Sequence, residues 1–385
     1  MKELEYPFDA AYIIKKRKSL KKVLLADGTS RIRKKIAVFG GSTTSDIVKT
    51  LELFLLDAGI EPEFYESEYA QYFQDAMFPD ETLLSFKPDI VFIHTTNRNV
   101  TNWPEMTDTA EQVDEKLHTE INRFTAMWKS IAEKFHCPII QNNFEMPLYR
   151  LLGSRDAWDI HGRTNFLTRL NEAFYAYARE NESFYIHDLN FVSADYGLKE
   201  WSNPLFWNMY KYAMCFEAIP SFAFSVSHII KSIFGKNKKA LALDLDNTLW
   251  GGVVGDDGVD GIEIGQETGV SQSYYEFQTY VKQLKSLGIV LTVCSKNDHE
   301  NAIAGLNHPE GALRPDDFVI IKANWENKDR NIAEIAAELN ILPDSIPQKR
   351  KVSGKNIQRV TIRWTLITVC SILVFKRVWR LPIFC

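Results

Sequence analysis

The chain has 385 residues, 45% of them hydrophobic and 12% aromatic, with a formal net charge of −5. This composition supports two or three domains with apolar cores and excludes an overall basic surface for nucleic acid. Five scattered cysteines without a CxxC pair argue against a disulfide framework and a zinc site. The N-terminus has no apolar signal segment, so we expect a cytoplasmic protein.

Residues 1–34 are mixed in character and basic in the middle. Such a charge run is typical of a solvated helix face, so we expect a helical lead-in. From residue 35 to residue 235, short apolar runs alternate with amphipathic segments, which predicts a doubly wound α/β domain with a parallel sheet. We expect strands near residues 35–39, 62–66, 88–94, 137–141 and 184–187, and helices near residues 45–58, 112–135, 163–181 and 220–234.

Polar residues follow three of these strands, namely Ser42, Asn97 and Asn142. Since the carboxyl ends of parallel strands share one edge of a sheet, we expect these side chains to converge. The arrangement resembles an SGNH-hydrolase-like domain, in which a Ser after the first strand is the nucleophile and a late Asp-x-x-His supplies the base. The late segment 201–207 contains no His, so Ser42 has no general base. We therefore expect a structural or ligand-binding domain rather than an esterase. Phosphate binding by the Gly pair before Ser42 is the alternative, although no Walker Lys follows it.

A second domain is expected over residues 238–345, after a short polar linker. It opens with the apolar run Ala240–Leu243, typical of a buried parallel strand, which ends in Asp244 and Asp246. With one residue between them, the two carboxylates can point to the same side of an extended chain, where they repel unless a cation or a proton lies between them. Mg²⁺ prefers such oxygen ligands. The alternative is an ordinary strand end with turn-forming Asp and Asn.

The full string, Asp-Leu-Asp-Asn-Thr-Leu-Trp-Gly-Gly-Val-Val-Gly from Asp244, favours the first interpretation. It resembles motif I of the haloacid dehalogenase (HAD) superfamily, in the form typical of the FkbH-like members of its subfamily IIIC phosphatases. The resemblance implies a second α/β parallel-sheet domain of the HAD type. It also implies that Asp244 is the phosphoryl-accepting nucleophile, that Asp246 is the general acid/base, and that both contribute to a Mg²⁺ site.

Six glycines lie between residues 251 and 265. Glycines at this density suit a tight hairpin, and the resemblance implies a hairpin flap that screens the site from water. The space before the next helix is too short for a large cap domain. We therefore expect a small or open site that admits a bulky substrate, including one carried on another protein.

The next strand is expected at Ile289–Cys294 and ends in Ser-Lys-Asn-Asp. This string resembles HAD motif II, which implies that Ser295 donates a hydrogen bond to the transferring phosphoryl group, with Asn297 beside it in phosphate binding. The alternative is a Ser in an ordinary strand-to-helix turn. We expect Asp298 to cap the following helix. Cys294 is most simply a small buried residue, and a thiol acceptor for an acyl group is the weaker alternative.

A further strand is expected at Asp317–Lys322, followed by a polar segment and a helix. The segment resembles HAD motif III, whose Lys neutralises the charge of the nucleophile and the phosphate. The resemblance assigns this role to Lys328 at the helix start. Lys322 is the rival, but its place at the strand end fits the motif less well.

No acid follows Asp344, although a HAD domain needs a fourth motif with further Mg²⁺ ligands. The resemblance covers residues 35–345, and residues 346–385 carry nine Lys or Arg and no Asp or Glu. We expect this basic and apolar tail to be a shifted reading frame or an otherwise unrelated end, and we expect weak Mg²⁺ binding and slow turnover. Its apolar stretch at 364–375 is shorter than the roughly 20 residues that span a bilayer, so a membrane anchor is not favoured.

Two functions remain open. The first is Mg²⁺-dependent phosphohydrolysis or phosphoryl transfer through an aspartyl-phosphate, and the FkbH-like resemblance implies a phosphorylated three-carbon acid destined for an acyl carrier protein. The second is a catalytically defective chain that binds only a ligand or a partner. Mg²⁺ affinity distinguishes the two.

Overall fold

The computed structural model describes residues 1–343 and residue 346. By its contacts the chain divides into two units, Met1–Lys231 and Ser232–Cys385. Both are mixed α/β units with parallel sheets, which confirms the predicted class at that level. Most of the tail predicted over 346–385 lies outside the described residues. In the described part, no helix is both long enough and apolar enough to cross a membrane.

The sheet of the first unit is parallel throughout, with the order β2-β1-β3-β4-β5. Its strands are β1 (Ile32–Gly40), β2 (Ile60–Glu66), β3 (Ile90–His94), β4 (Ile139–Asn142) and β5 (Phe184–His187). The order reverses between β1 and β3, which makes their carboxyl ends the topological switch point. Every residue of β3 is buried, as expected for a strand covered on both faces.

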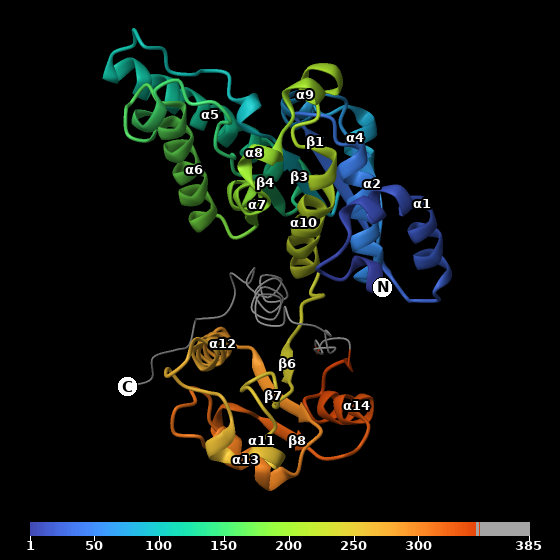
Figure 1. Ribbon diagram of the computed structural model, residues 1–385. Coiled ribbons are helices and arrows are strands. Elements are labelled where there is room, and N and C mark those ends of the chain that lie inside the picture. Colours follow the sequence, from blue (N-terminus) through green and yellow to red (C-terminus); the bar gives the residue numbers. More distant parts are fainter. Residues whose placement is uncertain (344–345, 347–385) are drawn as a thin grey trace, which may run out of the picture. The chain divides into compact units, whose positions relative to one another are not determined.

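Helices cover both faces of this sheet (Figure 1). They are α1 (Ala10–Ala26), α2 (Ser45–Asp57), α3 (Tyr72–Met77), α4 (Glu81–Phe86), α5 (Ala110–Phe135), α6 (Arg163–Glu180), α7 (Leu189–Tyr196), α8 (Leu198–Trp201), α9 (Pro204–Tyr210) and α10 (Ile219–Ile233). Helices α5 and α6 pack on one face. Helix α10 packs on the other, where Phe222 lies 6.1 Å from Phe92 of β3.

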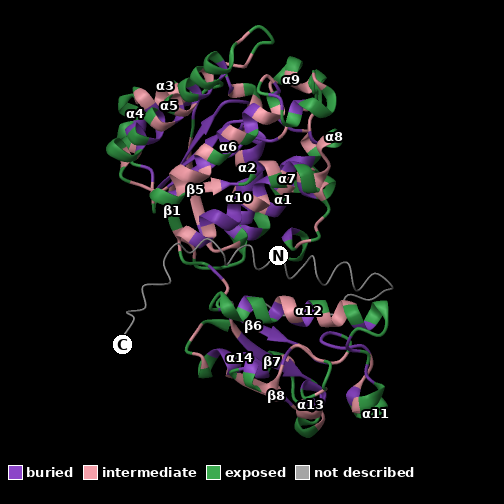
Figure 2. Cartoon of the chain, turned by 90° about the vertical axis from the view of Figure 1, so that its left-hand side faces the viewer, coloured by how far each residue is buried: buried purple, intermediate pink, exposed green. Residues whose placement is uncertain are grey.

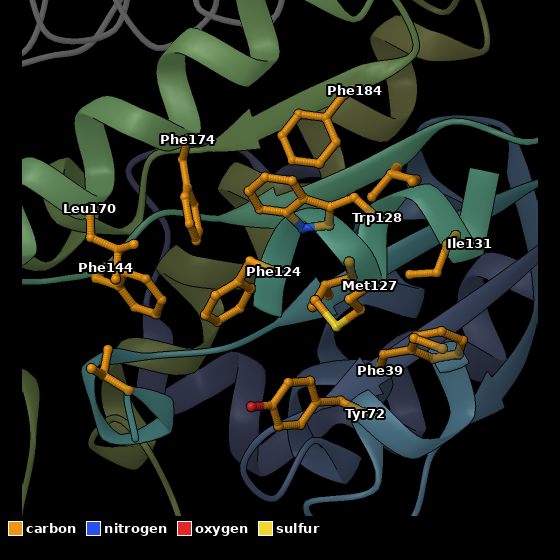
Figure 3. Packing of buried hydrophobic residues seen from close by; sticks show 14 of the residues in the cluster. Phe39, Tyr72, Phe124, Met127, Trp128, Ile131, Phe144, Leu170, Phe174 and Phe184 are labelled. Atoms are coloured by element: carbon orange, nitrogen blue, oxygen red, sulfur yellow. The ribbon is translucent and has the colours of Figure 1, made fainter. Parts of the chain in front are cut away.

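The core under α5 shows why this helix is fixed to the sheet (Figure 3). Phe124, Trp128 and Ile131 recur at helical spacing and are buried. The Trp128 ring lies 4.7 Å from that of Phe174 on α6. Its indole N–H donates to Gln141 Oε1 of β4 at 2.9 Å, which satisfies the one polar atom that the buried ring carries.

The second unit has a three-stranded parallel sheet of order β6-β7-β8. Its strands are β6 (Ala240–Leu243), β7 (Val290–Ser295) and β8 (Ile320–Ala323), and its helices are α11 (Val254–Asp257), α12 (Gly269–Ser286), α13 (His299–Leu306) and α14 (Lys328–Glu338). One face of the sheet packs against α12 and α13, and the other against α14. Strands β6 and β7 are mostly buried, whereas most of β8 is half-buried. Figure 2 shows buried strand residues at the centre of each unit.

The predicted hairpin flap is wrong. The glycine-rich stretch forms the short helix α11 and a single 3-10 turn at Val259–Gly261, joined to the site by one antiparallel bridge between Gly251 and Glu263. The reason is local hydrogen bonding. The Asp257 carboxylate accepts from the Val253 N–H at 2.7 Å and closes a helical turn where a hairpin strand would run straight on.

Candidate active site

The site residues of the second unit are brought together by the carboxyl edge of its sheet. Asp244 follows β6 directly, Ser295 is the last residue of β7, and Lys328 is the first residue of α14. In the register of the sheet, Leu243 pairs with Val293, and Ser295 pairs with Ala323 at the end of β8. Parallel strands therefore deliver groups that are distant in sequence to one edge.

Asp244 is the centre of this cluster. Its Oδ1 accepts from Ser295 Oγ at 2.8 Å, and its Oδ2 lies 2.7 Å from Lys328 Nζ. Ser295 is buried, whereas the Asp244 side chain keeps 19% of its surface exposed. The carboxylate is thus held on both oxygens by charge-assisted hydrogen bonds and still faces solvent.

Asp246 is held by three donors. Its Oδ1 accepts from the Trp250 indole N–H at 3.0 Å and from the Val254 N–H at 3.1 Å, and its Oδ2 accepts from Asn297 Nδ2 at 2.9 Å. The structure therefore places the Asn297 amide on Asp246, whereas the sequence predicts it beside the phosphate. These contacts fix the carboxylate next to the Asp244 cluster.

The sequence interpretation overlooks Trp250. The Trp250 ring is fully buried, and its one polar atom, the indole nitrogen, donates a hydrogen bond to Asp246. The sequence does indicate this contact, because a buried indole N–H needs a hydrogen-bond acceptor and Asp246 lies four residues before Trp250.

Trp250→Phe removes one of the three hydrogen bonds to Asp246 and keeps an aromatic ring. If Asp246 takes part in catalysis, we expect kcat to fall about tenfold with little change in KM, as for the loss of one group that positions a proton-transfer residue. Steady-state kinetics, with thermal unfolding measured in parallel, is the check. Equal falls in kcat and in folded fraction would point to a packing role alone.

Two other predicted residues lie elsewhere. Lys322 Nζ lies 2.6 Å from Glu338 and 3.4 Å from Glu334, both on α14, so its charge is engaged away from Asp244. Asp298 stands at the N-cap of α13, but its side chain makes no cap hydrogen bond. Its Oδ1 accepts instead from the Trp325 indole at 2.9 Å. The predicted capping contact is therefore wrong, because the indole competes for the same carboxylate.

Cys294 lies with the residues that pack under α14 and is buried. Burial raises the pKa of its thiol above the ordinary value, which disfavours the thiolate that a nucleophile needs. Its Sγ lies 3.8 Å from the Lys328 carbonyl oxygen. This environment suits a small buried residue better than an acyl acceptor.

The donor set of the site suits a hard cation in kind. Asp244 and Asp246 supply carboxylate oxygens, the ligand type that Mg²⁺ prefers. Both oxygens of Asp246 and both oxygens of Asp244 already accept hydrogen bonds, so a bound cation would share these oxygens with their present donors or replace those donors. Among residues 1–343 and 346, no group of three or more His, Cys, Asp and Glu side chains is arranged to hold a metal ion.

The corresponding edge of the first unit is closed around Ser42. The residue is 2% exposed, and within the described chain its hydroxyl has no hydrogen-bond partner. The amide N–H of Gly41 donates to the His94 carbonyl at 2.9 Å, and that of Thr43 donates to the Lys211 carbonyl at 3.0 Å. The two backbone donors on either side of Ser42 are therefore used within the fold and are not free to bind an oxyanion or a phosphate.

Ser42, Asn97 and Asn142 lie at the carboxyl ends of neighbouring parallel strands, at the same edge of the sheet, as predicted, but the two Asn side chains bond to groups other than Ser42. Asn97 donates to the Glu145 carbonyl at 3.3 Å. The Asn142 amide lies between two buried imidazoles: it donates to His94 Nδ1 at 2.9 Å and accepts from His187 Nδ1 at 2.8 Å. Burial lowers the pKa of His94 and of His187 to about 3, so both rings are neutral near pH 7.

Ser42→Ala is expected to leave any ester hydrolysis by the protein unchanged. The hydroxyl is buried, no described base contacts it, and the neighbouring N–H groups are occupied. Hydrolysis of p-nitrophenyl acetate by the wild type and the variant is the measurement. Activity that disappears in Ser42→Ala alone would contradict this reading.

The chain is similar to a known protein family and to solved structures. The family model described as "FkbH, N-terminal domain" matches residues 35–231, just over half of the chain. The N-terminal part of a Bacteroides fragilis protein, containing a phosphatase domain and crystallised in complex with Mg, is 30% identical with a TM-score of 0.75, over 86% of this chain and 87% of that one.

Two further solved structures are more distant. A putative acylhydrolase from Bacteroides fragilis is 16% identical with a TM-score of 0.32, over 56% of this chain and 96% of that one. A GDSL-like lipase from Bacteroides thetaiotaomicron is 12% identical with a TM-score of 0.29, over 57% and 98%. No curated protein matches the sequence. The family match and the phosphatase-containing relative agree, and the chain belongs to the family of proteins that carry the FkbH N-terminal domain.

Proposed function

We propose that the second unit is a phosphohydrolase or phosphoryl-transfer unit of the HAD type, FkbH-like, with Asp244 as the nucleophile. The observation that carries the proposal is the arrangement of Ser295 and Lys328 on the two oxygens of one solvent-accessible carboxylate. A cation and a hydroxyl donor at these distances suit a group that receives a phosphoryl, because both can also bind phosphoryl oxygens. The Bacteroides fragilis relative with a phosphatase domain supports the proposal.

In the proposed reaction, an oxygen of Asp244 attacks phosphorus in line with the leaving oxygen. The bond from phosphorus to the leaving oxygen breaks, and Asp246 gives that oxygen a proton. Lys328 and Ser295 hold the phosphoryl oxygens and offset the charge that develops on them. Asp246 then takes a proton from water as the water attacks the aspartyl-phosphate, which releases phosphate and restores the Asp244 carboxylate.

Asp244 and Asp246 are the residues that would hold Mg²⁺. When bound, the ion would offset the negative charge of the carboxylates and of the phosphoryl group. The relative crystallised with Mg supports this cofactor. Within this chain, Lys328 supplies a fixed positive charge on the Asp244 side of the cluster.

The substrate and the partner are further proposals. The resemblance of the motifs favours a phosphorylated three-carbon acid destined for an acyl carrier protein, in the cytoplasm. A net charge of −5 disfavours nucleic acid as a partner.

The alternative is a catalytically defective chain that binds only a ligand or a partner. It is favoured by the small number of acids at the site, because the described residues offer Asp244 and Asp246 and no group of three metal-binding side chains. Calorimetric titration with Mg²⁺ distinguishes the two. A Kd for Mg²⁺ no higher than the Mg²⁺ concentration of the activity assay supports the enzyme, and a lack of measurable binding supports the defective chain.

The direct test of the proposed activity is Mg²⁺-dependent release of phosphate from p-nitrophenyl phosphate. We expect turnover that a chelator abolishes and that added Mg²⁺ restores. Turnover that persists in the chelator and in the Asp244→Asn variant would show that the site acts by other chemistry.

A further inference from the structure

Trp325 is an anomaly of the second unit. Tryptophan has the largest side chain of the twenty amino acids and a mostly apolar one, yet 69% of the surface of Trp325 is exposed. It lies in the short connection between β8 and α14, where Asn324 N–H donates to the Ser295 carbonyl at 3.2 Å. The ring is linked to the Asp244 cluster through its acceptor, because Asp298 directly follows Asn297, whose amide donates to Asp246.

The exposed ring is held in place. Its Nε1–H donates to Asp298 Oδ1 at 2.9 Å, and this carboxylate makes no capping contact with its own helix. The connection is itself ordered by hydrogen bonds. Glu326 N–H donates to Asn324 Oδ1 at 3.1 Å, and the Asn324 and Asn331 amides bond to each other. Because the ring is fixed before any ligand arrives, a ligand that stacks on it loses less conformational entropy.

We propose that Trp325 is a specificity-determining residue of the site and that it stacks on the non-phosphate part of the substrate. The stacking part is then planar and weakly polar, such as an aromatic ring or an amide chain. A three-carbon acid alone is too small to cover the indole, so the inferred substrate carries such a group in addition to the phosphorylated acid. The inference rests on the proposed function, since it assumes that phosphate binds at Lys328 and Ser295. Asp298 is a positioning residue that acts through the indole.

Binding without Mg²⁺ separates the inference from catalysis. Phenyl phosphate, methyl phosphate and inorganic phosphate are titrated into the full chain by calorimetry. We expect phenyl phosphate to bind about tenfold tighter than methyl phosphate, the size of a favourable aromatic contact. Trp325→Ala removes this preference and leaves the Kd of inorganic phosphate unchanged, whereas Trp325→Phe keeps most of it. Trp158→Ala is the matched control, because Trp158 is 68% exposed but lies in the first unit.

The Asp298→Ala variant provides a second test of the same inference. Asp298→Ala should weaken phenyl phosphate binding about threefold in the wild type and not at all in the Trp325→Ala background, since coupled residues are not additive. Equal losses in both backgrounds would show that Asp298 acts on its own. A phenyl preference that survives Trp325→Ala, or one that the wild type lacks, overturns the inference.

The proposed function has its own readout. Lys328→Ala should weaken all three ligands alike, because it removes the positive charge that meets the phosphate. If inorganic phosphate binds through Lys328 but phenyl phosphate binds no tighter than methyl phosphate, only the inference fails. If none of the three ligands binds the wild type either without or with Mg²⁺, both proposals fail.

Discussion

Asp244→Asn should lower phosphomonoester turnover by about 10⁴-fold or more, as for the loss of a nucleophile that no neighbour replaces. The amide keeps the shape of the side chain and can still accept from Ser295, but it neither attacks phosphorus nor forms the 2.7 Å ion pair with Lys328. Release of phosphate in the presence of Mg²⁺ is the measurement. Binding of beryllofluoride, which mimics a phosphoryl group on a carboxylate, should vanish with it.

The matched control for this variant is Asp256→Asn. Asp256 is an exposed acid on α11, and the change removes the same charge from the same unit without touching the Asp244 cluster. We expect wild-type turnover from it. Comparable losses in the two variants would mean that net charge or folding, rather than a nucleophile, controls the rate. Turnover retained by Asp244→Asn would rule out the assignment.

Lys328→Ala is expected to lower kcat/KM about 10²- to 10³-fold, the usual cost of removing one fixed group that stabilises developing charge. The Nζ lies 2.7 Å from Asp244 Oδ2, and its loss leaves the negative charge of the carboxylate and of the substrate without this counter-charge. Steady-state kinetics at two ionic strengths checks the effect. The Lys328→Arg variant should recover part of the rate, because it restores the charge with a different geometry.

Lys322→Ala is the control for Lys328→Ala, because it also removes one Lys from the second unit. Lys322 stands six residues earlier and pairs with Glu334 and Glu338 rather than with Asp244. Its loss should change stability slightly, as for other partly exposed ion pairs, and leave kcat/KM near the wild-type value. A larger loss of activity from Lys322→Ala than from Lys328→Ala would reverse the assignment that the geometry favours.

Much of this cluster could be predicted because its members sit at the ends of elements with strong local signals. The apolar runs before Asp244 and Ser295 predict buried parallel strands, and such strands align their carboxyl ends. Lys328 opens a helix whose start the sequence also marks. Once β6, β7 and β8 form one parallel sheet and α14 follows β8 after a short connection, the three side chains meet at one edge.

The contacts that the sequence could not supply are tertiary hydrogen bonds between side chains. Whether Asp298 caps its own helix or accepts from Trp325 depends on how β7 and β8 align, which local propensity does not determine. The same holds for Asn297, which reaches Asp246 rather than an open position. The short helices α7 to α9 were also not predicted, because segments of four to eight residues carry little periodicity.

The two buried imidazoles bridged by Asn142, those of His94 and His187, make the stability of the first unit depend on pH. Each titrates at about 3 in the folded chain against an ordinary value of 6.5, so the unfolded chain takes up these protons first. The resulting stability is fully present above pH 6.5 and is lost progressively as the pH falls from there toward 3. Each pH unit in that window lowers the free energy of unfolding by up to about 1.4 kcal/mol per ring. Protonation of the two rings would therefore destabilise this unit at its strand ends, where both rings pack against Phe222.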